Sequence, residues 1–189
     1  MATSQYLLYL DRKVEFASGT GTFSAGSTTW TLPFTDSTID CVVPASGAND
    51  GVPLPPTRPT SSTVRVTGDY SAIAVTIGRK YAASFELSQP FCRSREGNVI
   101  APVAVVKRLA IAHRRAGSYT VTCVRPSAMG NVAQSFAPPS GTLVSNFGRY
   151  IAWVFGHGEK NRFTISDTSP KPMVISGIDI IHEQSEALH

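Results

Sequence analysis

Alternation of apolar with polar residues is the feature that most constrains the fold of this chain. Tyr119, Val121 and Cys123 are separated by threonines, and a threonine also separates Phe163 from Ile165. The same period recurs in other short runs: Ile73, Val75 and Ile77; Phe85 and Leu87; Ile151, Trp153 and Phe155. Side chains of a strand point alternately to its two faces, so a period of two predicts half-buried β-strands. We therefore expect an all-β protein, an antiparallel β-sandwich or a set of barrel-like modules.

Glycine-centred turn signals separate these runs. They are Thr67-Gly68-Asp69, Ile77-Gly78-Arg79, Ala116-Gly117-Ser118 and Gly156-His157-Gly158. Glycine tolerates the positive φ that tight hairpin turns require. The spacing of these signals supports a chain of short antiparallel strands.

Three segments depart from simple alternation. Val103 to Arg115 is compatible with an amphipathic helix, but Pro102 precedes it and the parity of Leu109, Ile111 and His113 favours a strand pair. Pro44 to Ser62 and Pro126 to Thr142 are rich in proline and lack apolar periodicity, so we expect two long extended loops. Long loops in compact domains often contact a partner.

The length of 189 residues and the 42% hydrophobic content predict a globular chain with a real core. We expect one β domain over residues 1–189, with a possible division into an N-terminal part, 1–62, and a main β-sandwich, 63–189. The expected core of the closing strands consists of Trp153, Phe155, Phe163 and Ile165.

Positive charge is concentrated in the middle of the chain. Arg79 to Arg125 holds nine basic and two acidic residues, a balance of 9 − 2 = +7, and the remainder holds eight basic and eleven acidic residues, a balance of −3. Such asymmetry marks a phosphate-facing surface, a charged subunit interface or a solvated strand face. The candidate subunit-contact or channel-facing residues are Lys107, Arg108, Arg114 and Arg115. In an unbulged strand Lys107 and Arg115 share one face, and Arg108 and Arg114 share the other.

No residue pattern indicates catalysis. The histidines lack metal-ligand spacing, and the glycines at Gly19 and Gly21 are not followed by the Lys-Ser/Thr of a phosphate loop. Carboxylate pairs such as Asp11 with Glu15, or Asp36 with Asp40, are usually solvated in strands and turns. We expect no catalytic residue, no cofactor and no metal, and hence a protein that is not an enzyme.

The cysteines and the apolar runs bear on the compartment. Cys41, Cys92 and Cys123 are odd in number and form no CxxC motif, which predicts buried reduced thiols in a protein made in a cytoplasm. No apolar run approaches the roughly 20 residues of a membrane span, and Met1 to Leu10 lacks a basic region. We expect neither a membrane span nor a signal peptide.

Five blocks in order resemble the tail tubular protein B, or tail nozzle, family of short-tailed bacteriophages. The opening blocks are LDRKVEF, TTWTLPF and VRVTGDYSAIAVTIGRKYAASFELSQP. The later blocks are VVKRLAIAHRRAGSYTVTCVRP, similar to a hairpin of that family, and GRYIAWVFGHGEKNRFTISDTSPKPMVISGIDI, similar to its closing meander. The family's chains are several times longer, and the proline-rich segment at Pro44 has no counterpart.

The resemblance implies a structural virion protein, made in the host cytoplasm and located in the phage tail. Subunits of such nozzles form a ring, a hexamer, around the DNA ejection channel, and they contact adaptor and fibre proteins and, transiently, the phage DNA. For ring contacts we expect the basic segment to face acids of a neighbouring subunit, drawn from Asp167, Asp179, Glu183 and Glu186.

Two other functions remain open from the sequence. A carbohydrate- or receptor-binding β-sandwich would use stacking platforms drawn from Trp30, Tyr70, Tyr81 and Tyr150. A basic nucleic-acid-binding β protein would use the segment of balance +7 and would bind any duplex with strong salt dependence.

Overall fold

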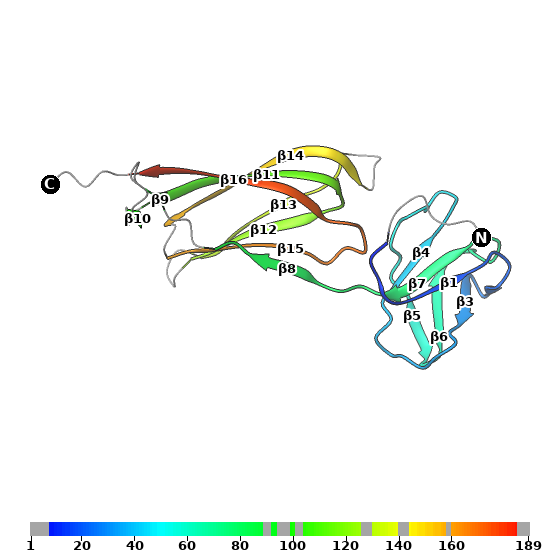
Figure 1. Cartoon of the computed structure of the whole chain (residues 1–189). Helices are drawn as coiled ribbons and strands as arrows, with labels where there is room; N and C mark the ends of the chain where they lie inside the picture. The colour runs from blue at the N-terminus through cyan, green and yellow to red at the C-terminus, as the bar shows by residue number, and fades with distance from the viewer. Residues whose placement is uncertain are drawn as a thin grey trace. The chain divides into compact units, whose positions relative to one another are not determined.

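The computed structural model describes residues 8–88, 92–93, 99–100, 104–125, 130–139, 144–157 and 160–184, and within these ranges the regular elements are strands. The expectation of an all-β antiparallel fold is confirmed. The chain forms two compact units, residues 1–81 and 82–189 (Figure 1). The boundary follows Tyr81 rather than Ser62, because β6 (Thr63–Thr67) pairs with β3 (Ser27–Thr31) and so belongs to the first unit.

The N-terminal unit contains two small sheets. The first has the order β1-β7-β4, and the second has the order β2-β3-β6-β5. Their remaining strands are β1 (Asp11–Phe16), β2 (Thr22–Ser24), β4 (Cys41–Pro44), β5 (Thr57–Thr60) and β7 (Val75–Arg79). Trp30 and Val64 from one sheet pack with Val42 and Ile77 from the other in a single apolar core. Burial of both inward faces is what stabilises this unit.

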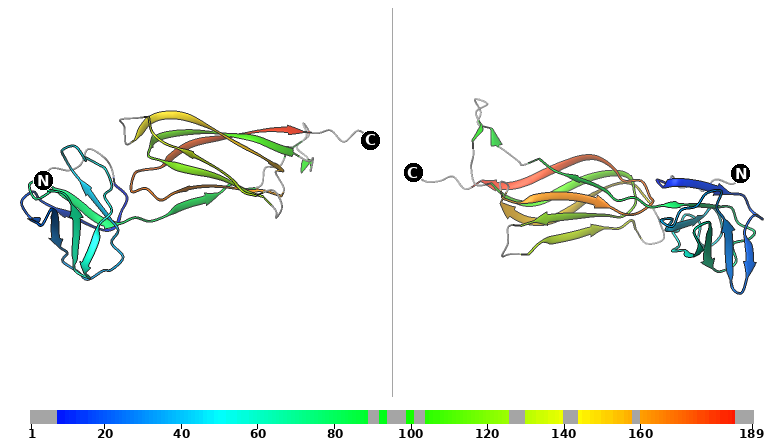
Figure 2. Two further views of the ribbon diagram at one scale, coloured as in Figure 1. Left: turned by 180° about the vertical axis from the view of Figure 1, so that it is seen from behind. Right: turned by 90° about the horizontal axis from the view of Figure 1, so that it is seen from below.

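The C-terminal unit is a β-sandwich of two antiparallel sheets, visible as two layers in Figure 1 and from two further sides in Figure 2. One sheet has the order β13-β12-β15-β8 and the other the order β14-β11-β16. Their strands are β8 (Ala83–Glu86), β11 (Ala104–Ala116), β12 (Tyr119–Val124), β13 (Val132–Phe136), β14 (Ser145–His157), β15 (Arg162–Asp167) and β16 (Val174–Gln184). A separate short hairpin joins β9 (Cys92–Arg93) and β10 (Val99–Ile100).

The core of the sandwich confirms half of the residues expected there. Phe163 is 1% exposed and Ile165 is 0% exposed, as predicted. Trp153 is 46% exposed and Phe155 is 49% exposed, so their assignment to the core is wrong. The inward residues of this part of β14 are the smaller Ala152 and Val154, both 0% exposed. From Ile151 to Phe155 the larger side chains of β14 therefore point outward, against the usual link between size and burial, whereas Tyr150 packs against the core.

Glycines explain why the inward parity of β14 carries small residues. A Cβ at Gly148 would lie 2.7 Å from His113 Nε2, and a Cβ at Gly156 would lie 1.6 Å from Asn161 Nδ2. At these two positions the interior is already filled, by His113 of β11 and by Asn161, which precedes β15. Close packing leaves no room for a side chain at either glycine.

Several local expectations are corrected by hydrogen bonding and packing. Each expected proline-rich loop contains a strand: β5 lies within Pro44 to Ser62, and β13 lies within Pro126 to Thr142. β13 is a strand because Val132 and Phe136 pack against the core beside β12. Gly78 lies inside β7 rather than in a turn, paired with Cys41. The ambiguous segment Val103 to Arg115 is strand rather than helix, as expected, but it falls largely within the single strand β11 and is not a strand pair.

Candidate functional site

A row of exposed apolar side chains runs along the outer side of β14. Its members and their exposed fractions are Phe147 82%, Ile151 40%, Trp153 46% and Phe155 49%. Across the sheet, Arg108 of β11 lies opposite Trp153, and Ala110 lies opposite Ile151. We call the outward side chains of Ile151, Trp153, Phe155 and Arg108 the β14 face. Large exposed aromatics beside arginine are the residue types that dominate binding energy at protein interfaces.

The side chains of the β14 face are ordered by mutual contacts. The rings of Trp153 and Phe155 stack with centroids 5.9 Å apart and an interplanar angle of 19°. Arg108 Cζ lies 5.3 Å from the Trp153 ring centroid, a cation–π geometry. The arrangement is thus fixed before any partner arrives, which lowers the entropic cost of binding.

Side chains from outside the sheet hold the backbone under this face. Gln134 Nε2 donates to Trp153 O at 3.0 Å, and Trp153 N donates to Gln134 Oε1 at 2.9 Å. Arg125 Nη2 donates to Val154 O at 3.0 Å and to Phe155 O at 2.5 Å. β14 is an edge strand, so these contacts satisfy edge groups that would otherwise accept another strand.

Phe155 adopts a left-handed backbone conformation with φ of 34°. This conformation costs a non-glycine residue about 1–2 kcal/mol, and such strain tends to gather at functional positions. A register shift in the β11–β14 pairing between Val106 and Arg108 marks the same region as irregular. The backbone irregularity and the exposed aromatic rings therefore coincide in one place.

The four basic residues singled out in the sequence have different environments. Lys107 forms an ion pair with Glu183, and Arg108 lies over Trp153. Arg114 and Arg115 are exposed, and no described carboxylate forms an ion pair with either. The condition of an unbulged strand fails, because the register shifts at Val106/Arg108 and Arg115 has φ of 49°. Arg108 and Arg114, opposite Trp153 and Phe147, both point to the outer side of the sheet.

The acids expected to meet a neighbouring subunit are used within the chain. Asp179 pairs with Arg149 at 2.9 Å, and Glu183 pairs with Lys107. Asp167 is 7% exposed, and its Oδ1 accepts the backbone N–H of Ser169 at 2.7 Å. Burial raises the pKa of Asp167, against the opposing effect of backbone N–H groups. Glu186 lies outside the described residues.

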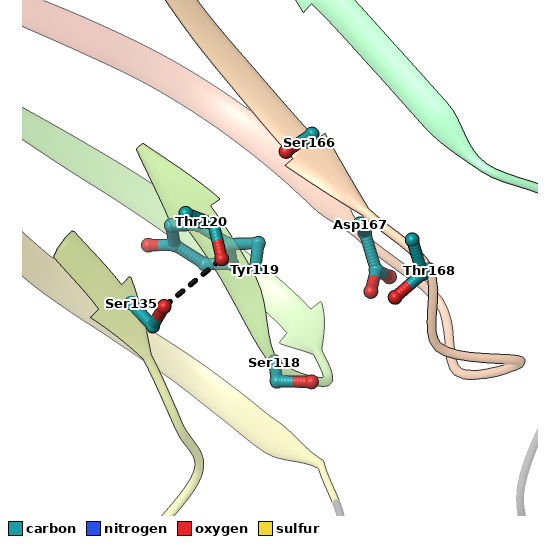
Figure 3. A pocket seen from close by; sticks show the side chains of 7 residues that line it. All are labelled: Ser118, Tyr119, Thr120, Ser135, Ser166, Asp167 and Thr168. Carbon is teal, nitrogen blue, oxygen red and sulfur yellow. Dashed lines mark hydrogen bonds between the residues drawn. The ribbon is translucent and has the colours of Figure 1, made fainter. Parts of the chain in front are cut away.

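A pocket with a volume of about 230 Å³ lies at one end of the β13-β12-β15-β8 sheet (Figure 3). Its lining is dominated by hydroxyl groups and comes from Ser118, Tyr119, Thr120, Ser135, Ser166, Asp167 and Thr168. The hydroxyls of Thr120 and Ser135 are 2.9 Å apart and hydrogen-bonded. The Tyr119 side chain is 2% exposed, so its ring offers no open stacking surface to a sugar. The pocket can hydrogen-bond water or a small polyol.

His113 is a buried polar residue of the sandwich, 1% exposed. Its Nδ1 lies 3.0 Å from Tyr119 Oη and its Nε2 lies 3.2 Å from Ser145 Oγ. The ring also packs on Phe136, with centroids 4.3 Å apart. Burial lowers the pKa of His113. These contacts assign it a structural role.

The cysteines, the proposed stacking aromatics and the groups that could bind a metal were also considered in the sequence. Cys41 and Cys123 are buried and form no disulfide, as predicted, and the side chain of Cys92 lies outside the described residues. Of the proposed stacking platforms, Trp30 is 1% exposed, Tyr70 and Tyr150 pack against the two cores, and Tyr81 is 47% exposed. In the described ranges, no three His, Cys, Asp or Glu side chains are grouped as metal ligands. Those ranges also contain no helix of the length and hydropathy of a membrane span.

Sequence reasoning missed Trp153 and Phe155 as surface residues. The positions of two glycines could have predicted this exposure. Gly148 and Gly156 are an even number of residues from Ala152, whereas Trp153 and Phe155 are an odd number from it. Glycine within a strand often marks close approach of another group. That parity therefore indicates the crowded interior, and the aromatics lie on the other face.

No known family model matches the chain, and no curated protein matches it.

Proposed function

We propose that this chain is a structural virion protein, a module of the tail nozzle ring of a short-tailed bacteriophage that lines the DNA ejection channel and contacts other tail proteins. The five sequence blocks support this proposal because they fall on the strands of both units. LDRKVEF covers β1 and TTWTLPF contains most of β3, while the closing block carries most of β14, all of β15 and most of β16. The blocks thus include strands of both units together with the segments that connect them.

The observation that carries an assembly role is the β14 face. Trp153 and Phe155 remain 46% and 49% exposed although a sandwich core lies directly behind their strand. Exposed aromatic clusters on a soluble surface mark sites of protein contact. Gln134 and Arg125 supply hydrogen bonds that hold this part of the strand in place. A rigid β module with such a face suits a wall that is built from contacts between proteins.

Electron micrographs of the protein in its assembly test the proposal. The expected result is a ring of this chain. Self-association of the chain alone should be weak and should fall as salt is raised, because complementary charge orients neighbours. The double variant Arg114→Glu and Arg115→Glu should impair the ring and leave the monomer folded, since both side chains are exposed. A ring unchanged by this reversal, or a chain that stays monomeric in the virion, contradicts the mechanism.

A nucleic-acid-binding β protein is the second candidate, favoured by the distribution of charge between the units. Residues 82–189 hold eleven basic and seven acidic residues, a balance of 11 − 7 = +4, whereas residues 1–81 hold six of each. Binding to duplex DNA that falls steeply with salt, in a chain that forms no ring, would support this candidate. The carbohydrate-binding candidate has less support, because Arg108 lies over the ring of Trp153, the large exposed aromatic of the β14 face. Glycan-array binding tests it.

A further inference from the structure

We propose that the β14 face docks a different protein, through a surface on that partner that carries apolar side chains flanked by carboxylates. This inference names a partner for the proposed function, and it rests on that function because a protein of an assembly must contact other proteins.

The partner covers the face rather than extending the sheet edge. A partner that added a strand to β14 would need the free backbone groups of that edge. At Trp153 both of these groups are taken by the Gln134 amide, and the carbonyls of Val154 and Phe155 accept from Arg125. Tyr150 Oη also bonds the backbone of β13, at Ser135 O. Strand addition is thus blocked where the aromatics lie, and side-chain packing on the face remains open.

The face is apolar at its centre. Ile151 and the stacked pair of Trp153 and Phe155 project from β14, and the neighbouring positions on β11 and β16 include the small residues Ala110 and Gly177. Ala110 is only 1% exposed and offers no space, whereas a Cβ at Gly177 would meet nothing within 4 Å, so room for side chains of a partner lies on the β16 side of the face. A surface of this kind loses water favourably against another apolar protein surface.

The surrounding charges define the remaining chemistry of the partner. Arg108 points to the outer side of the sheet, over Trp153, and forms no ion pair with a described carboxylate. Burying an arginine without a counter-charge is costly, so a stable complex needs carboxylates on the partner. The nearby Lys107 and Arg149 already have their partners, Glu183 and Asp179.

A second copy of this chain fits this description poorly. Two copies of the β14 face pressed together would bring like charges into contact. Every acidic residue in the described part of the chain already interacts within the chain: Asp179, Glu183 and Glu86 pair with cations, Asp167 bonds a backbone amide, and the acids of the N-terminal unit have contacts of their own. A different chain is the better source of carboxylates.

The two tryptophans make a direct test possible. Trp30 is 1% exposed in the N-terminal core, and Trp153 is 46% exposed on the face. The full chain labelled with fluorinated tryptophan gives one fluorine NMR signal from each. The probe is a synthetic β-hairpin peptide with valine and tyrosine on one face and glutamate at its rim, and its control carries lysine in place of glutamate. We expect the glutamate peptide to shift the Trp153 signal and to leave the Trp30 signal in place.

Matched variants complete the experiment. Phe155→Ala and Arg108→Gln should each weaken the peptide by about tenfold, the usual effect of removing an interface anchor. Phe23→Ala, an exposed aromatic of the N-terminal unit at 45%, should leave binding unchanged. An unchanged Trp30 signal in each variant reports that the N-terminal unit remains folded, and retained strand dichroism does so for the whole chain.

The other occupants give distinct results. A Trp153 shift on raising the protein concentration alone, without peptide, assigns the face to a second copy and overturns the proposal. A shift with a thymidine oligonucleotide assigns it to nucleic acid and overturns it too, as does equal binding of the lysine peptide or no shift with any probe. A missing ring in micrographs would refute the proposed function and leave this result intact, because the titration uses the chain alone.

Discussion

The outer face of the β13-β12-β15-β8 sheet carries hydroxyl groups, whereas the outer face of the β14-β11-β16 sheet carries aromatic rings and guanidinium groups. Thr120, Ser135 and Ser166 contribute to the first, and Trp153, Phe155 and Arg108 to the second. Both faces cover the same core with the same strand periodicity. A solvated sheet face needs only polar side chains. The outer face of the β14-β11-β16 sheet is therefore more apolar than solvation requires, and variants of the core and of the two faces should show this difference.

The largest loss of stability is expected for a substitution in the core, compared with one on an outer face. Phe163→Ala should lower the free energy of unfolding by about 3–5 kcal/mol, because it leaves a cavity between the sheets. Trp153→Ala, an equally drastic truncation on the outer side, should cost about 1 kcal/mol or less. Urea unfolding of each variant measures the difference. Similar losses for the two variants would return Trp153 to the core and remove the aromatic face.

The next largest loss of stability is expected where the Gln134 side chain of β13 bonds the backbone of β14. Gln134→Ala should lower the free energy of unfolding by about 1–3 kcal/mol, because it removes two hydrogen bonds to the Trp153 backbone. It should also speed hydrogen exchange at the Trp153 amide, measured by NMR. The control is Ser135→Ala, one residue along on the hydroxyl face, which should leave that amide protected. An unchanged exchange rate in Gln134→Ala would show that the side chain does not hold the edge.

The stability of the fold should depend on pH through His113, which is buried between the two sheets. Burial holds the pKa of His113 below its usual 6.5, so the unfolded chain binds more protons there than the folded chain. This contribution to stability is present above pH 6.5 and is lost as the pH falls from 6.5 through the lower folded pKa. Urea midpoints at about pH 7.5 and about pH 5.5 should differ more for the natural chain than for His113→Phe. Equal differences would place the titration elsewhere.

The smallest effect is expected on the hydroxyl face. Thr120→Val removes a hydroxyl bonded to Ser135 and keeps the shape of the side chain. The free energy of unfolding should change by about 0.5 kcal/mol or less, since the group is on the outer side of the sheet. Thermal unfolding checks this value. A loss comparable to that of Gln134→Ala would mean that the hydroxyl pocket has a structural role, and the contrast between the faces would weaken.

The amino-acid sequence by itself determined the class of structure and most of the strands of the C-terminal sandwich. A period of two is a local property of an extended backbone, so the runs at Tyr119–Val124 and Arg162–Asp167 predict their own strands. The assignment of Phe163 and Ile165 to the core follows from the same periodicity. The four basic residues of β11 were also visible, because charge asymmetry can be counted without knowing the fold.

Only the tertiary structure decided which side of β14 faces the core. Alternation defines two faces but does not say which one is covered, and size misleads where His113 and Asn161 already fill the space beside Gly148 and Gly156. The strands inside the proline-rich segments depend in the same way on distant partners, as β13 does on β12. The pairing of Asp179 with Arg149, and of Glu183 with Lys107, depends on strand register. Contacts between residues far apart in the chain set all of these features, and a local pattern does not contain them.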